Sequence, residues 1–339
     1  MKSRLAAAIV VVLAGCGGVQ GNPDEPIPVR LGYFPNVTHA TASVGVEQGL
    51  FEEALGSGVD LTVQAFNAGP DAIEAIFNGA LDATYIGPNP AINAFTRSDG
   101  EAIRIIAGAT SGGAALVVRD GISTPEQLAG TTLATPQLGN TQDVALRAWL
   151  AEQGYETDLE GGGDVSIIPQ ANGQTLEAFR AGEVDGAWVP EPWATRLVEE
   201  GGGHVLVDEA DLWPNGQFVT THLIVATEFL EDHPDLVKRL LEGHLEANVF
   251  VNEHPAEAQE LVGTAIAELT GAELPADILE AAWANLEFTV DPIPTSLTVS
   301  ADHAYDLGLI ESADLDGIYD LTLLNEVLRE AGEPEISGP

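Results

Sequence analysis

Short apolar runs alternate with amphipathic stretches along this chain of 339 residues, and the alternation comes in two blocks. The first block predicts strands at 29–34, 59–66, 82–86 and 102–107, and helices at 40–50, 70–78 and 88–97. A regular exchange of strand and helix indicates an α/β unit, in which helices cover the faces of a mostly parallel sheet.

The same pattern resumes after residue 120, with strands predicted at 131–134, 165–169, 186–189 and 204–207 and helices at 141–153, 174–181 and 192–200. After residue 223 the apolar spacing predicts helices alone, at 235–252, 255–269, 275–287 and 296–309. The length allows two cores. We therefore expect a discontinuous lobe 1 (29–118 and 223–339), a lobe 2 (119–222), and a cleft between them.

The first sixteen residues have the pattern of an export signal. Lys2 and Arg4 precede nine apolar residues at 5–13, which are too few to span a bilayer. The letters LAGC at 13–16 resemble the lipobox of bacterial lipoproteins, in which Cys16 becomes the lipidated first residue. The alternative is an ordinary secretory signal with an incidental cysteine. Residues 17–28 predict a flexible tether, so we expect a monomer held by lipid at the extracytoplasmic face of the membrane.

The composition excludes several classes of function. A net charge of −41, from 53 acidic and 12 basic residues, repels nucleic acid. The single cysteine excludes internal disulfides and cysteine-rich metal sites. No common catalytic or nucleotide-binding motif is present. We therefore expect no catalytic residues, no metal, no cofactor and no nucleic-acid partner.

Four loops rich in Gly, Pro, Asn, Ser and Thr, at 35–39, 87–90, 110–113 and 138–142, each follow a predicted strand. Backbone N–H groups at a helix start, together with the helix dipole, hold anions. Each loop alone is equally explained as a helix cap or tight turn. The candidate ligand-binding residues from these loops are Asn36, Thr38, His39, Gly87, Pro88, Asn89, Ser111, Gly112, Gly139, Asn140, Thr141 and Gln142.

A stiff aromatic loop follows the predicted strand at 186–189. Trp188 and Trp193 enclose two prolines and Glu191, and either indole is an apolar wall for a ligand or part of a core. Thr220, Thr221 and His222 lie at the second crossing between the lobes and add candidate hydroxyl and imidazole donors. His39 and His222 are the groups near the site that can carry a positive charge near neutral pH.

The segments 32–40, 66–70, 85–90, 134–147 and 187–193 resemble, in order, the nitrate/sulfonate/taurine (aliphatic sulfonate-binding, NMT1/THI5-like) family of ABC substrate-binding proteins. The resemblance covers about residues 29–310. It implies a type II periplasmic-binding-protein fold, a ligand in the interlobe cleft, and a membrane permease and a cytoplasmic ATPase as partners. By resemblance, the anion-contacting loops map onto Asn36, Thr38 and His39, onto Gly87, Pro88 and Asn89, and onto Gly139, Asn140 and Thr141, and the aromatic wall maps onto Trp188 or Trp193.

The predicted cargo is a small organic anion. Because the loops contain no Lys or Arg, we expect a monoanion with an organic body, an aliphatic sulfonate or taurine, rather than sulfate or phosphate. Nitrate is an alternative, as is a neutral heterocycle such as a pyrimidine precursor or flavin stacked on tryptophan. An enzyme of the pyrimidine-synthase type is less favoured, because by resemblance such enzymes need a cysteine-rich motif that this chain lacks.

Overall fold

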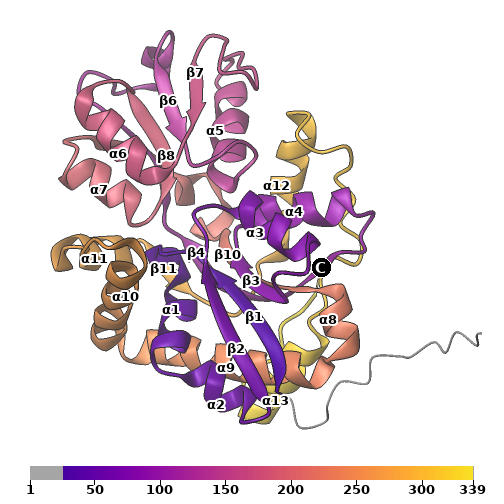
Figure 1. The fold of residues 1–339 in the computed structure, drawn as a ribbon. Helices are drawn as coiled ribbons and strands as arrows, with labels where there is room; N and C mark the ends of the chain where they lie inside the picture. The colour runs from indigo at the N-terminus through magenta and orange to yellow at the C-terminus, as the bar shows by residue number, and fades with distance from the viewer. Residues whose placement is uncertain (1–25, 339) are drawn as a thin grey trace, which may run out of the picture.

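A computed structural model describes residues 26–338, which form two lobes around two separate sheets (Figure 1). The predicted export signal with Cys16, and most of the predicted tether, lie outside the described residues. The strand order is β11-β4-β10-β3-β1-β2 in the six-stranded sheet and β7-β6-β8-β5-β9 in the five-stranded sheet.

The first lobe contains the strands β1 (Ile27–Tyr33), β2 (Val59–Ala65), β3 (Ala83–Ile86), β4 (Ile103–Gly112), β10 (Val219–Ala226) and β11 (Leu286–Phe288). Its helices are η1 (Val37–His39), α1 (Ala40–Glu47), α2 (Leu50–Leu55), α3 (Gly69–Phe77), α4 (Pro88–Arg97), α8 (Thr227–Asp232), α9 (Pro234–Glu253), α10 (Pro255–Thr270), α11 (Ala276–Trp283), α12 (Pro294–Asp306) and α13 (Thr322–Ala331).

The second lobe contains the strands β5 (Ala114–Val118), β6 (Thr132–Thr135), β7 (Ser166–Pro169), β8 (Gly186–Pro190) and β9 (His204–Asp208). Its helices are η2 (Pro125–Leu128), α5 (Thr141–Glu152), α6 (Asn172–Ala181) and α7 (Trp193–Glu199). The short helices η3 (Glu209–Leu212) and η4 (Pro214–Gly216) lie in the segment that returns to the first lobe.

The predicted α/β class is confirmed, but both sheets are mixed rather than mostly parallel. β1 is parallel to β2 and β3, and β6 is parallel to β7 and β8. The strands next to the lobe crossings, β10 and β5, pair antiparallel with their neighbours. The predicted lobe boundaries at 118/119 and 222/223 fall at the end of β5 and inside β10, so the chain changes sheet a few residues earlier at each crossing.

The first crossing is a two-glycine turn between β4 and β5. Gly112 and Gly113 have φ angles of 79° and 72°, a region that L side chains rarely adopt. A Cβ on Gly112 would lie 2.8 Å from the backbone O of Asn285, so the close approach of the segment before β11 also favours glycine there. The backbone can therefore turn from one sheet directly into the other.

The helices after β10 pack on the first sheet. α9 buries Leu236, Leu240 and Leu241 against α1, α2 and the sheet, and its helical spacing was visible in the sequence. The predicted helix at 275–287 is wrong at its end, because Leu286 and Phe288 leave the helix to pair with the edge of β4. α2, α8 and α13 were not predicted.

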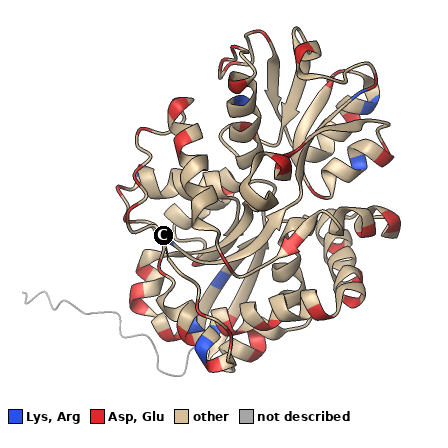
Figure 2. Cartoon of the chain, turned by 180° about the vertical axis from the view of Figure 1, so that it is seen from behind, with Lys and Arg blue, Asp and Glu red and all other residues tan. Residues whose placement is uncertain are grey.

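Acidic residues are spread over the outer helices and loops of both lobes, and basic residues are few (Figure 2). Such a surface keeps the protein soluble without defining its fold. Within residues 26–338, no helix combines the length and the apolar character needed to cross a membrane.

Candidate functional site

A small cavity lies where the carboxyl ends of strands from both lobes meet, which is the usual ligand position in open α/β sheets. Its volume is about 30 Å³, close to the share of one water molecule in the liquid. The residues that line it are Phe34, Asn36, Thr38, His39, Asn67, Ala68, Gly87, Pro136, Asn140, Thr141, Gln142, Asn172, Pro190 and Thr220.

The lobes are closed on each other around this cavity. Trp193 Nε1 in lobe 2 donates a hydrogen bond of 3.0 Å to Asn36 Oδ1 in lobe 1. At the side of the first crossing, Asn285 Nδ2 donates a bond of 2.7 Å to Glu191 Oε1. These bonds join residues far apart in the sequence, and they would break if the lobes separated.

The structure brings seven of the predicted site residues together around the cavity: Asn36, Thr38, His39, Gly87, Asn140, Thr141 and Gln142. The other predicted residues do not line it: Pro88, Asn89, Ser111, Gly112, Gly139, Trp188, Glu191, Trp193 and Thr221. Three of the four predicted loops therefore contribute to the cavity, and the loop at 110–113 does not.

Several of these residues are held elsewhere by hydrogen bonds. Asn89 Nδ2 donates to Ser300 O at 3.2 Å, so the side chain of Asn89 is directed away from the cavity, and the adjoining Pro88 does not line it either. Ser111 Oγ accepts from Phe218 N at 3.3 Å, and Gly112 O accepts from the hydroxyl of Thr220. The loop at 110–113 thus serves the lobe crossing.

The aromatic wall predicted at Trp188 is wrong. Its indole is fully buried in the core of lobe 2, with its ring centroid 5.9 Å from that of Trp149. Its Nε1 donates to Glu209 Oε2 at 2.7 Å. The core alternative weighed for this residue is therefore correct, while Trp193 bridges the lobes through Asn36.

Two further predicted residues face away from the cavity. Glu191 accepts hydrogen bonds from the backbone N–H and the hydroxyl of Thr195, in addition to the one from Asn285. Thr221 is replaced at the cavity by its neighbour Thr220. The pairing of β10 with β4 shifts register on both sides of Thr221, so the regular alternation of side chains does not fix which of the two threonines faces the cavity.

The start of α5 presents unpaired donors to the cavity. Among the described residues, the backbone N–H groups of Thr141 and Gln142 have no hydrogen-bond partner. Thr141 Oγ1 is also buried without a partner. At a helix start such groups are oriented toward a negative charge by the helix itself.

Asp143 fixes the loop in front of this helix. One carboxylate oxygen accepts from Thr135 Oγ1 at 2.8 Å, and the other accepts from Gly139 N at 2.9 Å. Arg147 Nε, one helical turn later, donates to the same carboxylate at 3.0 Å, and both side chains are buried. Gly139 therefore supports the site from behind and does not line it.

His39 is neutral in this environment. Burial lowers its pKa to about 3. Its Nδ1 accepts from Phe34 N at 3.3 Å, so the neutral ring carries its proton on Nε2, for which the described residues offer no acceptor. Burial also lowers the pKa of His222 to about 4, and its Nε2 bonds Pro292 O rather than the cavity. Burial therefore disfavours the positive charge that either histidine could supply near neutral pH.

Sequence reasoning missed Asn67 and Asn172, as well as the apolar lining residues Phe34, Ala68, Pro136 and Pro190, whereas Thr220 was a candidate donor and does line the cavity. Asn67 lies between β2 and α3, and Asn172 is the first residue of α6. That is the signal used to choose Asn140, so the same rule applied to every strand end would have found them.

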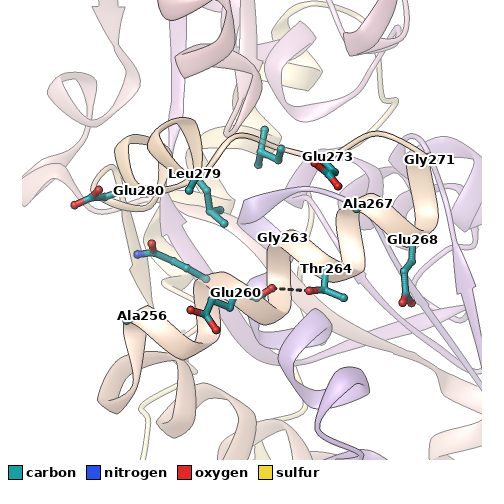
Figure 3. Close-up of a pocket in the computed structure, with 13 residues that line it drawn as sticks. Ala256, Glu260, Gly263, Thr264, Ala267, Glu268, Gly271, Glu273, Leu279 and Glu280 are labelled. Atoms are coloured by element: carbon teal, nitrogen blue, oxygen red, sulfur yellow. Dashed lines mark hydrogen bonds between the residues drawn. The ribbon is translucent and has the colours of Figure 1, made fainter.

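A larger cavity of about 890 Å³ lies between α10 and α11 (Figure 3). Glu260, Glu268, Glu273 and Glu280 line it, and Thr264 Oγ1 bonds Glu260 O at 2.9 Å along the helix. Four carboxylates repel an anion. The small interlobe cavity, which no Lys, Arg, Asp or Glu lines, is therefore the candidate site.

Comparisons with known proteins agree with this architecture. A putative aliphatic sulfonates-binding protein of Bacillus subtilis is 26% identical over 331 residues, which cover 95% of each chain. The taurine-binding periplasmic protein of Escherichia coli is 27% identical over 191 residues, 56% of this chain and 57% of that protein. The periplasmic nitrate-binding protein NrtA from Synechocystis PCC 6803 superposes with a TM-score of 0.77 at 16% identity, covering 92% of this chain and 91% of NrtA.

The likeness to NrtA confirms the predicted periplasmic-binding-protein fold. The sequence profile of the NMT1-like family matches residues 22–267, most of the chain. The protein therefore belongs to the NMT1-like family.

Proposed function

We propose that this protein is the extracytoplasmic solute-binding subunit of an ABC importer and that it captures a small organic anion, an aliphatic sulfonate or taurine. The observation that carries the proposal is the set of unpaired donors around one interlobe cavity: the N–H groups of Thr141 and Gln142 and the Nε2–H of His39. The names of the relatives from E. coli and B. subtilis support the same ligand class.

The charge of the cavity favours a monoanion. Its donors are neutral amides, hydroxyls and an imidazole, and no cation lines it. Moving a charge out of water costs several kcal/mol even after relaxation, and the cost rises with charge. Neutral donors at one helix start can offset this for a single charge, so sulfate and phosphate dianions should bind poorly.

Capture requires the lobes to open and close. The ligand enters the open form, binds the helix starts, and shifts the population toward the closed form that it prefers. The bonds from Trp193 to Asn36 and from Asn285 to Glu191 stabilise the closed form. The closed form is then the one that docks on the permease.

Nitrate is a second candidate, because the cavity of about 30 Å³ is small even for taurine. An organic body requires the lobes to separate slightly beyond their position in this structure. A stacked pyrimidine precursor or flavin has less support, since Trp188 is buried in a core and Trp193 is bonded to Asn36.

The remaining parts of the proposal concern partners and location. We propose that Cys16 carries a lipid anchor, that the mature protein is a monomer, and that a permease with a cytoplasmic ATPase receives the cargo. We propose binding rather than catalysis, because the cavity is lined by no cysteine, lysine or carboxylate that could act as a nucleophile or base. A change in mass at Cys16 of the membrane fraction would test the anchor.

Isothermal titration of the mature protein with taurine, methanesulfonate, nitrate and sulfate tests the ligand class. We expect taurine or methanesulfonate to bind at micromolar concentrations and sulfate to bind at least about a hundredfold more weakly, a difference of about 2.8 kcal/mol. Tight binding of nitrate alone would select the second candidate. No binding of any of these anions at millimolar concentration would contradict the proposal.

A further inference from the structure

A second cavity, of about 230 Å³, lies at the junction of the lobes and away from the anion cavity. Its lining comes from three parts of the chain: Trp149 on α5, Glu209 and Trp213 on the returning segment, and Val299 and His303 on α12. α12 belongs to the first lobe and packs beside α5 of the second (Figure 1). Any molecule in this cavity therefore touches both lobes.

Glu209 is a buried carboxyl group without a cationic partner. It is 2% exposed, and its Oε2 accepts from Trp188 Nε1 at 2.7 Å. None of the ion pairs within residues 26–338 includes it. Burial raises its pKa to about 7, against the opposing effect of hydrogen bonds from Trp188 and Trp213, and the nearby charge of Asp208 raises it further.

A glutamine could still accept the Trp188 bond through its single amide oxygen, without the cost of burying a charge. The carboxylate instead leaves a buried negative charge that no ion pair within residues 26–338 offsets. Besides Asp208, the titratable groups around it are Glu152 on α5 and His303 on α12, both of which line the cavity. No Lys or Arg lines it, so the local potential is negative.

The rest of the lining is aromatic and apolar. Trp213 is stacked on Phe218 with ring centroids 5.7 Å apart and an interplanar angle of 13°. Trp149 lines the cavity from α5 and is 6% exposed. Aromatic rings attract cations and also cover apolar groups. A carboxylate beside two indoles is a combination suited to an amine with an apolar body.

We propose that this cavity binds a small organic ammonium ion, whose charged head pairs with Glu209 and whose apolar part lies against Trp149 and Trp213. This is a site distinct from the anion cavity, and its occupation does not depend on the function proposed for that cavity.

The two sites are connected by α5. The first residues of this helix, Thr141 and Gln142, line the anion cavity, and Trp149, two turns later, lines the second one. A cation in the cavity between α5 and α12 favours the closed lobes and therefore tightens anion binding. By linkage, the anion tightens cation binding by the same factor. This coupling rests on the proposed function, whereas the cation site itself does not.

The test is calorimetric titration of the mature protein at pH 8 with benzylamine as the cation. Benzyl alcohol and benzoate are the neutral and anionic probes of similar shape. We expect benzylamine to bind at least about tenfold more tightly than benzyl alcohol, and Glu209→Gln to remove that preference. Because the carboxylate must be ionised, benzylamine should bind more weakly as the pH falls from 8 to 6.

Two further variants keep the outcome decisive. Glu280→Gln removes one negative charge from α11, which does not line this cavity, and should leave benzylamine binding unchanged. Trp213→Ala should weaken binding of the benzyl group. If circular dichroism shows that Glu209→Gln does not fold, benzylamine titration of Trp213→Ala becomes the test of the site. Equal binding of benzylamine and benzyl alcohol, or wild-type binding in a folded Glu209→Gln or Trp213→Ala variant, overturns the site. Taurine titrations of the same samples report the anion cavity separately.

Discussion

Thr141 Oγ1 is buried and finds no hydrogen-bond partner among the described residues. An unsatisfied buried polar group costs about 1–3 kcal/mol, so such groups are uncommon unless something else binds them. At the anion cavity the missing partner is the ligand. The ligand-free protein therefore carries the free-energy cost of this unsatisfied group, and a bound ligand that accepts its hydrogen bond removes the cost.

Thr141→Val tests, at one residue, whether stability of the free protein is exchanged for affinity for the anion. The substitution keeps the shape of the side chain and removes an unpaired hydroxyl, so the free energy of unfolding should rise or stay unchanged, while anion affinity should fall about tenfold. Urea unfolding and titration with taurine measure the two effects. Thr135→Val is the matched control: its hydroxyl donates to Asp143, so stability should fall by about 1 kcal/mol. Unchanged affinity in Thr141→Val would remove this hydroxyl from the site.

At this scale, sequence reasoning identified backbone donors better than side chains. Asn140, Thr141 and Gln142 were found because a helix start always leaves N–H groups free. The neutral state of His39 could not be predicted, since it depends on burial and on the Phe34 bond. Trp188 remained ambiguous for a similar reason, because only tertiary packing distinguishes a core indole from an exposed one.

At the scale of secondary structure, α5 is the element on which both cavities depend. Its start was predicted correctly from the Asn140 cap position and the apolar spacing that follows. α4 was also predicted with its observed bounds, because proline at the first helical position marks its start. β11 was missed because three residues carry little periodicity, and only pairing with β4 makes them a strand.

Asp143→Ala should destabilise the start of α5. The change leaves Arg147 buried without its ion pair and releases Thr135 and Gly139, so we expect a loss of about 3–5 kcal/mol in the free energy of unfolding. Urea unfolding measures it. The exposed pair of Glu74 and Arg97 provides the control, since Glu74→Ala should change stability by less than about 1 kcal/mol. A similarly small effect of Asp143→Ala would contradict the positioning role.

At the scale of the whole molecule, two lobes enclose the site and acidic groups cover the exterior. The two-lobed plan was predicted because the strand–helix pattern stops and resumes. The closed arrangement was not, because it depends on contacts such as Asn36 with Trp193, which are 157 residues apart. The mixed character of the sheets was missed for the same reason: strand direction at the crossings is a tertiary property.

The pH dependence of stability is a property of the whole chain. His39, His222 and His244 are buried and neutral, and burial lowers their pKa values to about 3, 4 and 4 from 6.5. Their contribution to the free energy of unfolding is fully present above pH 6.5. Acidification removes it, because the unfolded chain binds protons that the buried histidines of the folded chain do not bind. At pH 5 the loss is about 2 kcal/mol per histidine.

Glu209 acts in the opposite direction, since its raised pKa of about 7 adds stability as the pH falls from 7 toward 4.5. Three histidines outweigh one glutamate, so Tm should decrease steadily between pH 6.5 and 4.5. Calorimetric unfolding across this range checks the prediction. A Tm that is constant or rises on acidification would show that these histidines are protonated in the folded protein.

The central claim is that neutral donors at the start of α5 bind a monoanion, and proton–nitrogen NMR correlation spectra of the labelled mature protein test it most directly. On addition of taurine, the backbone amide protons of Thr141 and Gln142 should shift downfield together, as expected when an N–H begins to donate to an anion. If taurine binds while both signals stay in place, or if only amides elsewhere in the molecule shift, the anion does not bind at this helix start and the account is wrong.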